Sequence, residues 1–550
     1  MPLELGRAGD YLDMLKNSNH QGQTFSMLRR SLYLLPLLYG GSLFAAIDVP
    51  VKIESGMIKG IPGSDAAVTQ FLGIPFAAPP VGDMRWRPPQ AAVPWPNIRT
   101  ANRYSATCMQ HVGGEGPTRP WTIEFNAHGF QSEDCLYLNV WTAAASPDER
   151  RPVLVYVHGG GNREGSSDIP IYNGEGLARK GLVVVTINYR LNILGFLAHP
   201  ELTAESGYSA SGNYGLMDQQ AALRWVQQNI AAFGGDPAKV TVAGQSAGAG
   251  DMHYLTISPA AKGLFRGLIA QSGSKAWNDK SLPNPMTWLS LADAEQDGVK
   301  FAASLGAESL KDLRAMTWQQ LMTSDVRVQS RAVVGGALFP EGFAATYAKG
   351  NHNDVPFLTG ADMDEHGAEP HPDVHAAGFR QAVRERFGEM ADAFLKLYPV
   401  ASDADAPAAF NAVMRDYERA SMYFWAVDRQ KTSKTKAFTY YWTHAIPGPE
   451  ADRWGAFHCS EIPYFLNTLS ESPRPFETID HQIAETMSAY YVNFVTTGDP
   501  NGNGLASWPA VDPASPVTME LGDHYRPIPV ADMARLELLK KFFASQQEFR

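Results

Sequence analysis

Residues 240–255 read VTVAGQSAGAGDMHYL, an apolar run that ends abruptly at Gly244 and is followed by a helix-like segment. That segment contains Gly248 and Gly250, although glycine costs a helix about 1 kcal/mol relative to alanine. We interpret the stretch as a buried strand joined to a helix by a tight turn that carries Ser246. Such a turn strains the serine backbone, and glycines two residues to either side let neighbouring segments approach it. The alternative is an ordinary turn rich in glycine and serine.

The sequence VYVHGGGNREG (155–165) holds a second candidate element of a site. An apolar run ends at His158 and is followed by Gly159, Gly160 and Gly161, which leave their backbone N–H groups unhindered. A tetrahedral intermediate of acyl transfer needs such donors at its oxyanion, each worth roughly a factor of 10²–10³ in rate. A flexible or phosphate-binding loop is the alternative, but no Gly-Lys-Ser/Thr follows, which disfavours a P-loop.

Apolar runs of strand length recur along the chain and alternate with helical patterns. The central runs are apolar throughout, as in a parallel sheet covered on both faces. Residues 216–233 place apolar side chains on one helical face, and Gly234 and Gly235 end that helix. A last helix with one apolar stripe is expected from Val530 to Phe543. The alternation predicts an α/β fold, with a large mostly parallel central sheet and helices on both faces. The expected strands are 153–158, 182–189, 240–244, 268–273, 355–361 and 437–444.

Composition and charge indicate one large globular domain. Of the 550 residues, 44% are hydrophobic and 19% are charged, which supplies a sizeable core. The formal net charge of −11 argues against nucleic acid and anionic membrane surfaces as partners. No linker rich in Pro, Gly or Ser divides the chain, so we expect a single domain over residues 47–550. Insertions around 275–350 and 365–435 are expected to cap the edge of the sheet.

Residues 1–46 are typical of an export leader. Two arginines precede SLYLLPLLYGGSLFAA (31–46), about 16 mostly apolar residues that end in small ones. A membrane span needs about 20 such residues, so the run fits a signal peptide cleaved at one of its last two alanines. The polar residues before it suggest that translation begins at Met27, and an N-terminal membrane anchor is the alternative. We therefore expect an exported protein, periplasmic or secreted, with no stable membrane insertion once the leader is removed.

Long stretches of the chain resemble the type-B carboxylesterase family, which comprises carboxylesterases, cholinesterases and bacterial p-nitrobenzyl-type esterases. The resemblance extends over nearly the whole chain after the leader. It implies the α/β-hydrolase fold and a serine hydrolase that cleaves carboxylic esters. The stretches are FLGIPFAAPPVGDMRWRPP (71–89), SEDCLYLNVW (132–141), VHGGGN (157–162), TINYRLNILGFL (186–197), GNYGLMDQQAALRWVQQNIAAFGGDPAKVTVAGQSAGA (212–249), QSGS (271–274) and NFVTTGDPN (493–501).

The resemblance also assigns the groups that would act with Ser246. Glu365, in GADMDEHG (360–367), matches the family's acid, and His458, in GAFHCSEIPYFLN (455–467), matches its base. The chain order Ser…Glu…His is the order of this fold. On the residues alone, Glu365 belongs to an acidic run typical of a solvated loop, and any one of 14 histidines is more often structural.

The mechanism of the family requires no metal and no organic cofactor. An acyl-enzyme forms on the serine and is then cleaved by water. Backbone N–H groups of Gly160, Gly161 and Ala247 would bind the oxyanion in both steps. The positions that match supporting residues of the family's active site are Gln245, Ser272 and Glu461.

Three cysteines are too few for a disulfide scaffold. Cys108 and Cys135 lie 27 positions apart, and an exported chain could close that loop, but the spacing alone leaves the pairing open. The resemblance implies the bridge, because both cysteines fall in the family's N-terminal disulfide loop. Cys459 is left over, and the sequence assigns it no role.

Several departures from the family's pattern bear on the substrate. Gln245 stands where cholinesterases carry glutamate, which removes a buried negative charge beside the nucleophile. Phe125 falls where they place a choline-binding tryptophan, and phenylalanine is a weaker cation–π partner, although Trp121 lies close by. Asn162 replaces the bulky residue that usually follows the glycine triplet, which would widen the acyl side or add a hydrogen-bond donor; the alternative is a simple change in packing. We therefore place Asn162, Trp121 and Phe125 in the substrate pocket and expect a small-molecule ester other than a choline ester.

Three alternatives remain open. The same machinery could act on an amide, thioester or lactone bond. A non-catalytic adhesion protein on the same fold is disfavoured, because such relatives typically lose the serine that this chain keeps. His366 lies between Glu365 and Gly367 in a motif that is normally tighter, so Asp364 is the alternative acid. The sequence leaves the natural ester and the oligomeric state undetermined.

Overall fold

The computed structural model of the protein describes residues 46–111, 120–273, 287–365, 367–368 and 374–546. The expected leader, apart from Ala46, and His366 lie outside the described residues. Ala46 and Ile47 are buried, and the N–H of Ile47 donates to the carbonyl of Ala144 (3.0 Å). The described residues all belong to one compact unit.

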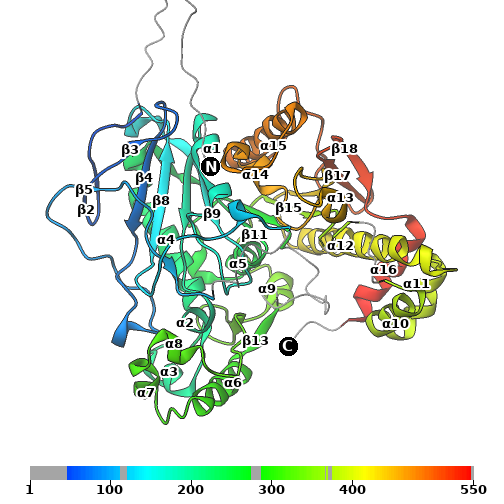
Figure 1. Cartoon of the computed structure of the whole chain (residues 1–550), viewed down its shortest axis with the longest axis horizontal. Helices are drawn as coiled ribbons and strands as arrows, with labels where there is room; N and C mark the ends of the chain where they lie inside the picture. Colours follow the sequence, from blue (N-terminus) through cyan, green and yellow to red (C-terminus); the bar gives the residue numbers. More distant parts are fainter. Residues whose placement is uncertain (1–45, 112–119, 274–286, 366, 369–373, 547–550) are drawn as a thin grey trace, which may run out of the picture. The chain divides into compact units, whose positions relative to one another are not determined.

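A sheet of 11 strands lies at the centre of this unit (Figure 1). All six strands predicted from the apolar runs are part of it, and one of them begins at Gly235 instead of Val240. A seventh, near the C-terminus, continues the same sheet. These strands are β9 (Arg151–Val157), β10 (Val183–Ile187), β11 (Gly235–Gln245), β12 (Gly267–Gln271), β15 (Phe357–Asp362), β16 (Ala437–Trp442) and β17 (Val517–Leu521).

These seven strands run parallel, in the spatial order β17-β16-β15-β12-β11-β9-β10. Antiparallel strands complete both edges, so the prediction of a mostly parallel sheet is confirmed. Because parallel strands end at the same edge, the turns after β9, β11, β12 and β15 come together there. The antiparallel strands are β18 (Arg526–Pro529) on one side and β8 (Tyr137–Thr142), β4 (Thr69–Pro75) and β3 (Ile61–Pro62) on the other.

Smaller sheets lie outside the central one in the described chain. Their strands are β1 (Val51–Ile53), β2 (Gly56–Lys59) and β5 (Arg99–Thr100) in one sheet, β6 (Thr107–Cys108) and β7 (Gln131–Ser132) in a second, and β13 (Trp288–Ser290) and β14 (Ala332–Val334) in a third.

Helices accompany the sheet, and the one predicted at 216–233 is among them (Figure 1). It begins at Tyr214 and ends in a 3-10 turn at Phe233, where Gly234 (φ 77°) takes the left-handed conformation favoured after a helix. The last predicted helix begins at Met533, inside the expected range. Outside the two expected insertions, the described α-helices are α1 (Glu175–Arg179), α2 (Asn192–Phe196), α3 (Pro200–Glu205), α4 (Tyr214–Asn229), α5 (Ala247–Thr256), α13 (Ala451–Trp454), α14 (Ile462–Phe465), α15 (Thr478–Thr497) and α16 (Met533–Ser545).

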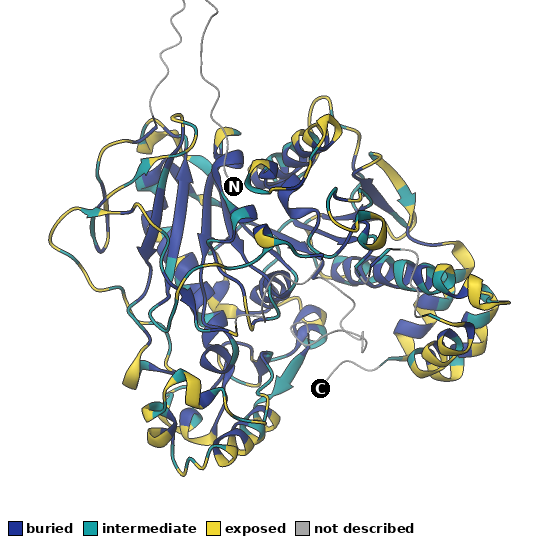
Figure 2. Ribbon diagram, in the orientation of Figure 1, coloured by how far each residue is buried: buried dark blue, intermediate teal, exposed yellow. Residues whose placement is uncertain are grey.

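Successive residues of the central strands point to opposite faces of the sheet, and both faces are buried (Figure 2). Val153 and Val155 of β9 belong to one core, together with side chains of α4 and α5. Leu154 and Tyr156 belong to a second core, together with side chains of α14 and α15. The two cores explain why these strands are apolar throughout instead of alternating.

The two expected insertions are rich in helix. In the second, α12 packs on the sheet as well as on α16, and Trp425 of α12 lies 4.3 Å from Phe357 of β15 between ring centroids. None of the described helices has the length and hydropathy that a membrane span requires. The helices of the insertions are α6 (Leu291–Ser304), α7 (Leu310–Ala315), α8 (Trp318–Leu321), α9 (Phe343–Ala348), α10 (Ala376–Phe387), α11 (Ala391–Leu397) and α12 (Ala406–Gln430).

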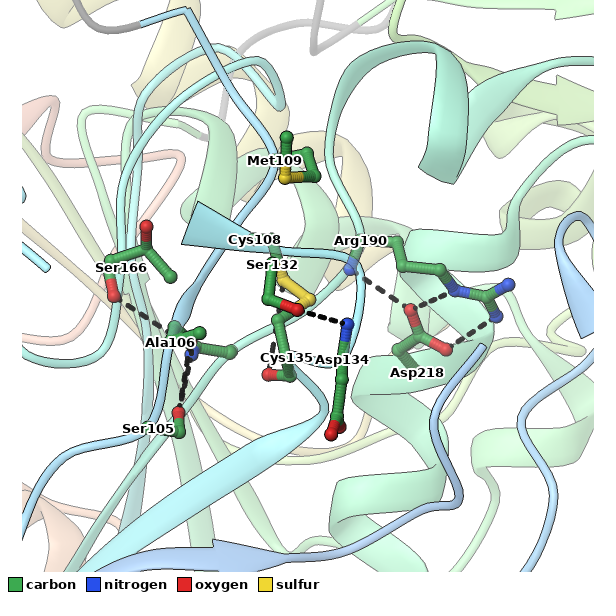
Figure 3. The surroundings of a disulfide bond; sticks show 12 residues. Ser105, Ala106, Cys108, Met109, Ser132, Asp134, Cys135, Ser166, Arg190 and Asp218 are labelled. Atoms are coloured by element: carbon green, nitrogen blue, oxygen red, sulfur yellow. Dashed lines mark hydrogen bonds and ion pairs between the residues drawn. A yellow bond between two sulfur atoms is a disulfide. The ribbon is translucent and has the colours of Figure 1, made fainter. Parts of the chain in front are cut away.

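A disulfide joins Cys108 to Cys135, which confirms the bridge that the family resemblance implied (Figure 3). Both cysteines are buried. Near the bridge, Arg190 follows β10 and pairs with Asp218 of α4 at 2.7 Å, with side chains only 3% and 0% exposed (Figure 3). A buried pair of this kind is costly to break, because the remaining charge would stay unpaired. The disulfide therefore holds Cys108 to the segment that precedes β8, and the ion pair holds the segment after β10 to α4.

Replacing both bridged cysteines (C108S/C135S) should lower the free energy of unfolding by about 3–4 kcal/mol, because a loop of 27 positions is no longer closed in the unfolded chain. The measurement is urea unfolding under oxidising conditions. C459S is the matched control, since Cys459 is unbridged, and it should leave the midpoint nearly unchanged. Equal stability of the double variant and the native protein would contradict the prediction.

Candidate active site

Ser246 occupies the turn between β11 and α5. Its backbone has φ 55° and ψ −121°, a conformation that side-chain-bearing residues rarely adopt. The Ser246 N–H donates to the carbonyl of Gln271 on the neighbouring strand (2.9 Å), and its carbonyl accepts from the N–H of Gly250 (3.0 Å). The strain is therefore held by hydrogen bonds on both sides of the residue, and the side chain remains partly exposed.

The two glycines of the motif permit a close approach of backbone to backbone. A Cβ at Gly244 would lie 2.5 Å from the carbonyl carbon of Gly248. A Cβ at Gly248 would lie 2.3 Å from the carbonyl oxygen of Val157, at the end of β9. No side chain fits at either position, so the start of α5 lies directly against the ends of its own strand and the adjacent one.

The glycine triplet runs beside this turn. A Cβ at Gly159 would come within 3.1 Å of the Ser246 Cβ. Gly160 (φ 100°) and Gly161 (φ 64°) are both left-handed, and a Cβ at Gly160 would lie 2.0 Å from a backbone oxygen. Within the described residues, no hydrogen bond occupies the N–H groups of Gly160, Gly161 or Ala247. Three backbone donors are thus available near the serine.

His158, immediately before the triplet, is buried and stacks on Tyr189 with ring centroids 4.5 Å apart. Burial lowers its pKa from 6.5 to about 4, so the ring is neutral near pH 7. Its Nδ1 lies 2.8 Å from the carbonyl oxygen of Gly159. His158 therefore supports the loop and is not a charged group of the site.

Glu365 and His458 are brought together from segments 93 positions apart. The Glu365 Oε2 accepts a hydrogen bond from His458 Nδ1, and Glu365 Oε1 accepts from the N–H of Asp362 (3.1 Å). The alternative acid, Asp364, lies elsewhere: its Oδ1 pairs with Arg415 (2.5 Å) and its Oδ2 accepts from the N–H of Ala456 (2.9 Å). The carboxylate that faces the imidazole is that of Glu365.

The second ring nitrogen of His458 faces the turn that carries Ser246. His458 Nε2 lies 3.2 Å from the side-chain Nε2 of Gln245, the residue before the serine. An amide donor at this position matches a neutral imidazole whose Nδ1 proton is directed at Glu365. In the described residues no hydrogen bond joins Ser246 Oγ to His458; such catalytic bonds are often long without substrate. The backbone of His458 is also held in place, because Trp121 Nε1 donates to the His458 carbonyl (3.0 Å).

Buried acidic groups surround the imidazole. Burial lowers the pKa of His458, whereas a Cys459 thiolate and the Glu365 carboxylate would each raise it. Burial also raises the pKa of the Cys459 thiol, which is therefore uncharged near neutral pH. The negative charge that stabilises an imidazolium at this position is consequently that of Glu365.

Asp362 and Glu461 are two buried carboxyl groups that interact with each other near the imidazole. Burial raises the pKa of Glu461 to about 7, although a hydrogen bond with Asp362 opposes the shift. Burial and the charges of Glu461 and Glu365 raise the pKa of Asp362 well above 3.8. Glu461 Oε1 accepts from Gln271 Nε2 (3.2 Å), and Gln271 also binds the Ser246 N–H through its backbone. This pair connects the histidine segment to the strand beside the serine.

One oxygen each of Asp362 and Glu365 and one nitrogen of His458 lie within 4.8 Å of one another, the spacing of a possible metal-binding group. Two of the three, Glu365 and His458, already satisfy each other by a hydrogen bond. Their arrangement is therefore complete as an acid–base pair.

The remaining candidate residues have different surroundings. Phe125 lies edge-on to Phe457, next to His458, at 5.8 Å between centroids, and is partly exposed. Asn162, expected in the substrate pocket, is 1% exposed and donates to Asp251 of α5 (3.0 Å). Ser272 is buried with φ 52°, and its hydroxyl has no hydrogen-bond partner among the described residues.

Two comparisons with known proteins identify the family. The Carboxylesterase family model matches residues 48–534. The chain belongs to the carboxylesterase family. It is also 37% identical over 475 residues to the fumonisin B1 esterase of Sphingopyxis macrogoltabida, and the matched region covers 83% of this chain and 83% of that protein. The protein is accordingly a carboxylic ester hydrolase of the α/β-hydrolase fold that acts on small molecules, as the sequence resemblance implied.

Three polar residues at this carboxylesterase site received no role from the sequence. They are Gln271, Asp362 and Asp251, which contact the segments of Ser246, Glu365 and Asn162 respectively. Each of the three lies in a strand or helix that is otherwise apolar or buried. For the two aspartates, the available signal in the sequence is a carboxyl group in such a segment without a basic neighbour.

Glu461→Gln should change how stability depends on pH. Since the folded pKa of Glu461 is raised from 4.5 to about 7, the folded state binds more protons than the unfolded state between those values, and stability falls as pH rises through them. The difference in stability between the variant and the native protein should therefore favour the variant more at pH 8 than at pH 5. Thermal midpoints at both pH values measure this, with Glu485→Gln, an exposed acid whose pKa is lowered, as control. An identical difference at both pH values would contradict the assignment.

Proposed function

We propose that this carboxylesterase is a serine esterase in which Ser246 is the nucleophile, His458 the general base and Glu365 the acid that orients it. The observation that carries the proposal is the bridging position of His458. Its Nδ1 bonds to Glu365, and its Nε2 faces the side chain next to Ser246. A ring that is held at one nitrogen by a carboxylate and directs the other toward the turn of a strained serine suits the roles that this chemistry requires.

In the proposed reaction, His458 Nε2 takes the proton of Ser246 as Oγ attacks the ester carbonyl. The imidazolium that forms is stabilised by Glu365, and it then donates the proton to the departing alcohol. Water then attacks the acyl-enzyme and loses a proton to the same nitrogen, which passes the proton to Ser246 Oγ as the carboxylic acid leaves. For the Ser246 hydroxyl to bond to Nε2, the Gln245 amide, which lies 3.2 Å from that nitrogen, must move aside.

The oxyanion would be bound by the backbone N–H groups of Gly160, Gly161 and Ala247. Support comes from their lack of other partners in the described chain and from the closeness of Gly159 to the Ser246 Cβ. The start of α5 adds the positive end of a helix dipole at the same place. Donors that are fixed before the reaction stabilise the intermediate without reorganisation, which is the largest electrostatic contribution in acyl transfer.

The substrate is a carboxylic ester whose alcohol carries no required positive charge. The neutral Gln245 beside the nucleophile supports this, as it supplies no charge to attract a cation. Trp121 and Phe125, on the side of His458, line the proposed substrate pocket. The similarity to a fumonisin B1 esterase makes fumonisin B1 one candidate for an ester panel, in which amides, thioesters and lactones test the alternative bonds.

We further propose that residues 47–550 act as one catalytic domain after export to the periplasm or the medium. The disulfide between Cys108 and Cys135 supports this, because such bridges persist in oxidising compartments. The buried position of Ile47 is consistent with a mature chain that begins near it.

Ser246→Ala should lower kcat for p-nitrophenyl acetate by about a millionfold, since the covalent route is lost. The thermal midpoint should remain that of the native protein, and mass spectrometry should find a sulfonyl fluoride adduct on Ser246 in the native protein alone. Substantial turnover by the variant, or an adduct on another residue, would refute the assignment.

Glu365→Gln should lower kcat by about 10⁴-fold, because an amide no longer fixes the imidazole tautomer or stabilises its charge. Asp364→Asn is the matched control, since Asp364 pairs with Arg415 and not with the imidazole. It should lower stability while changing kcat less than about tenfold. The opposite pattern of kcat values would assign the acid to Asp364.

A further inference from the structure

A buried carboxyl that the proposed mechanism does not use lies on the helix that follows the nucleophile. Asp251 of α5 is 1% exposed and has no ion-pair partner among the described residues. Its Oδ1 accepts from Asn162 Nδ2 (3.0 Å), and its Oδ2 accepts from Gln219 Nε2 of α4 (2.6 Å). Burial raises its pKa to about 7, although both hydrogen bonds oppose the shift. A group this costly to bury requires an account of what it does.

Asn162 is the residue that directly follows the glycine triplet. It is buried, has φ 58°, and its side-chain oxygen accepts from the hydroxyl of Tyr189 (3.1 Å). The same hydroxyl lies 3.0 Å from the carbonyl oxygen of His158, which precedes the triplet. The Asn162 carbonyl accepts from the N–H of Asn192 (2.7 Å). Both ends of the triplet are thus held, and among the described residues the side-chain bond that joins Asn162 to α5 is the one to Asp251.

We propose that the Asp251–Asn162 hydrogen bond is a positioning contact that holds the glycine triplet at a set distance from the start of α5. The N–H groups of Gly160 and Gly161 belong to the triplet, whereas that of Ala247 belongs to the helix. The bond therefore joins the two halves of the proposed oxyanion hole. This inference rests on the proposed function and extends it by two residues that touch neither substrate nor the reacting atoms.

The physical reason is the softness of a glycine triplet. Glycine has more accessible backbone conformations than any other residue, so three in succession do not hold their N–H groups in one direction by themselves. Binding of an oxyanion depends on donors placed to within about 0.5 Å. A hydrogen bond between two buried side chains, one on the loop and one on the helix, supplies the missing restraint.

The first test removes the bond from the loop side. Asn162→Gly keeps a residue that tolerates the left-handed backbone but deletes the amide. Asn213→Gly is the matched control, because Asn213 is also buried and left-handed (φ 62°) and its amide makes two bonds, both to the backbone of Val333. Asn162→Gly should lower kcat for p-nitrophenyl acetate by about 10- to 100-fold with little change in KM, and Asn213→Gly should not.

An alkyl trifluoromethyl ketone distinguishes positioning from general loss of structure. It forms a tetrahedral adduct on the serine and so reports on the oxyanion donors, whereas KM reports mainly on the bound ester. Its inhibition constant should rise for Asn162→Gly in the same proportion as kcat/KM falls. An unchanged inhibition constant, or equal losses in the Asn213→Gly control, would overturn the proposal.

The second test exchanges the two groups. Asn162→Asp places two carboxyls face to face and should lower kcat further than Asn162→Gly. Adding Asp251→Asn restores one carboxylate and one amide across the same contact, so N162D/D251N should recover most of the inhibitor affinity. No recovery in a folded double variant would show that the two residues do not act as a pair.

These experiments remain separable from the test of the nucleophile. Each variant should still be labelled at Ser246 by a sulfonyl fluoride, at a reduced rate. If Ser246→Ala retains activity, the proposed function fails. If Ser246→Ala is inactive but the positioning variants behave like the native enzyme, the present inference fails and the proposed function stands.

Discussion

The structure depends on one strained turn, in which Ser246 joins β11 to α5 with a left-handed backbone. Strain of this kind costs of order 1–3 kcal/mol and persists only where the surroundings over-determine it. Here the surroundings are backbone atoms: Gly244 and Gly248 let α5 lie against the strand ends, and the carbonyl of Gln271 binds the serine N–H. The parallel order of β9, β11 and β12 in the sheet is therefore a precondition of the site as well as of the fold.

A second constraint is electrostatic, because several carboxyl groups are buried near one imidazole. Not all of them can be ionised at neutral pH, and burial raises the pKa values of Asp362 and Glu461. Glu365 is the carboxylate in direct contact with His458. Burial that opposes ionisation of Asp362 and Glu461 favours a negative charge on the carboxyl that contacts the imidazole, where an imidazolium would form. The net charge of the protein plays no part in this arrangement, which is local.

The polar groups around the glycine triplet are connected by hydrogen bonds. Tyr189 contacts the carbonyl before the triplet and the side chain after it, and Asp251 connects that side chain to α5. The substitution of asparagine for a bulky residue at position 162 is thus accompanied by a carboxyl on the facing helix. In the structure, Asn162 makes a buried contact between the loop and the helix.

Much of the fold followed from local patterns. The apolar runs and the 3.6-residue periodicity predicted six strands and two helices, because burial on both faces of a sheet imposes a continuous apolar composition. The antiparallel edge strands β3, β4 and β8 and the small sheets were not predicted. The strand β3 and the strands of the small sheets are very short, whereas β4 and β8 are longer and mostly buried but pair with each other from positions far apart along the chain.

The sequence by itself predicted the strained turn at Ser246 and the glycine triplet, because a strained backbone and a close backbone approach require glycine at particular positions. It named Glu365 and His458 only through resemblance to a family, because acids and histidines leave no local pattern. Tertiary structure alone decided that Glu365 and not Asp364 faces the imidazole, that Asn162 is buried against Asp251, and that Gln245 contacts His458. These contacts join residues that lie between 51 and 213 positions apart along the chain, and only the packing of strands and helices brings such residues together.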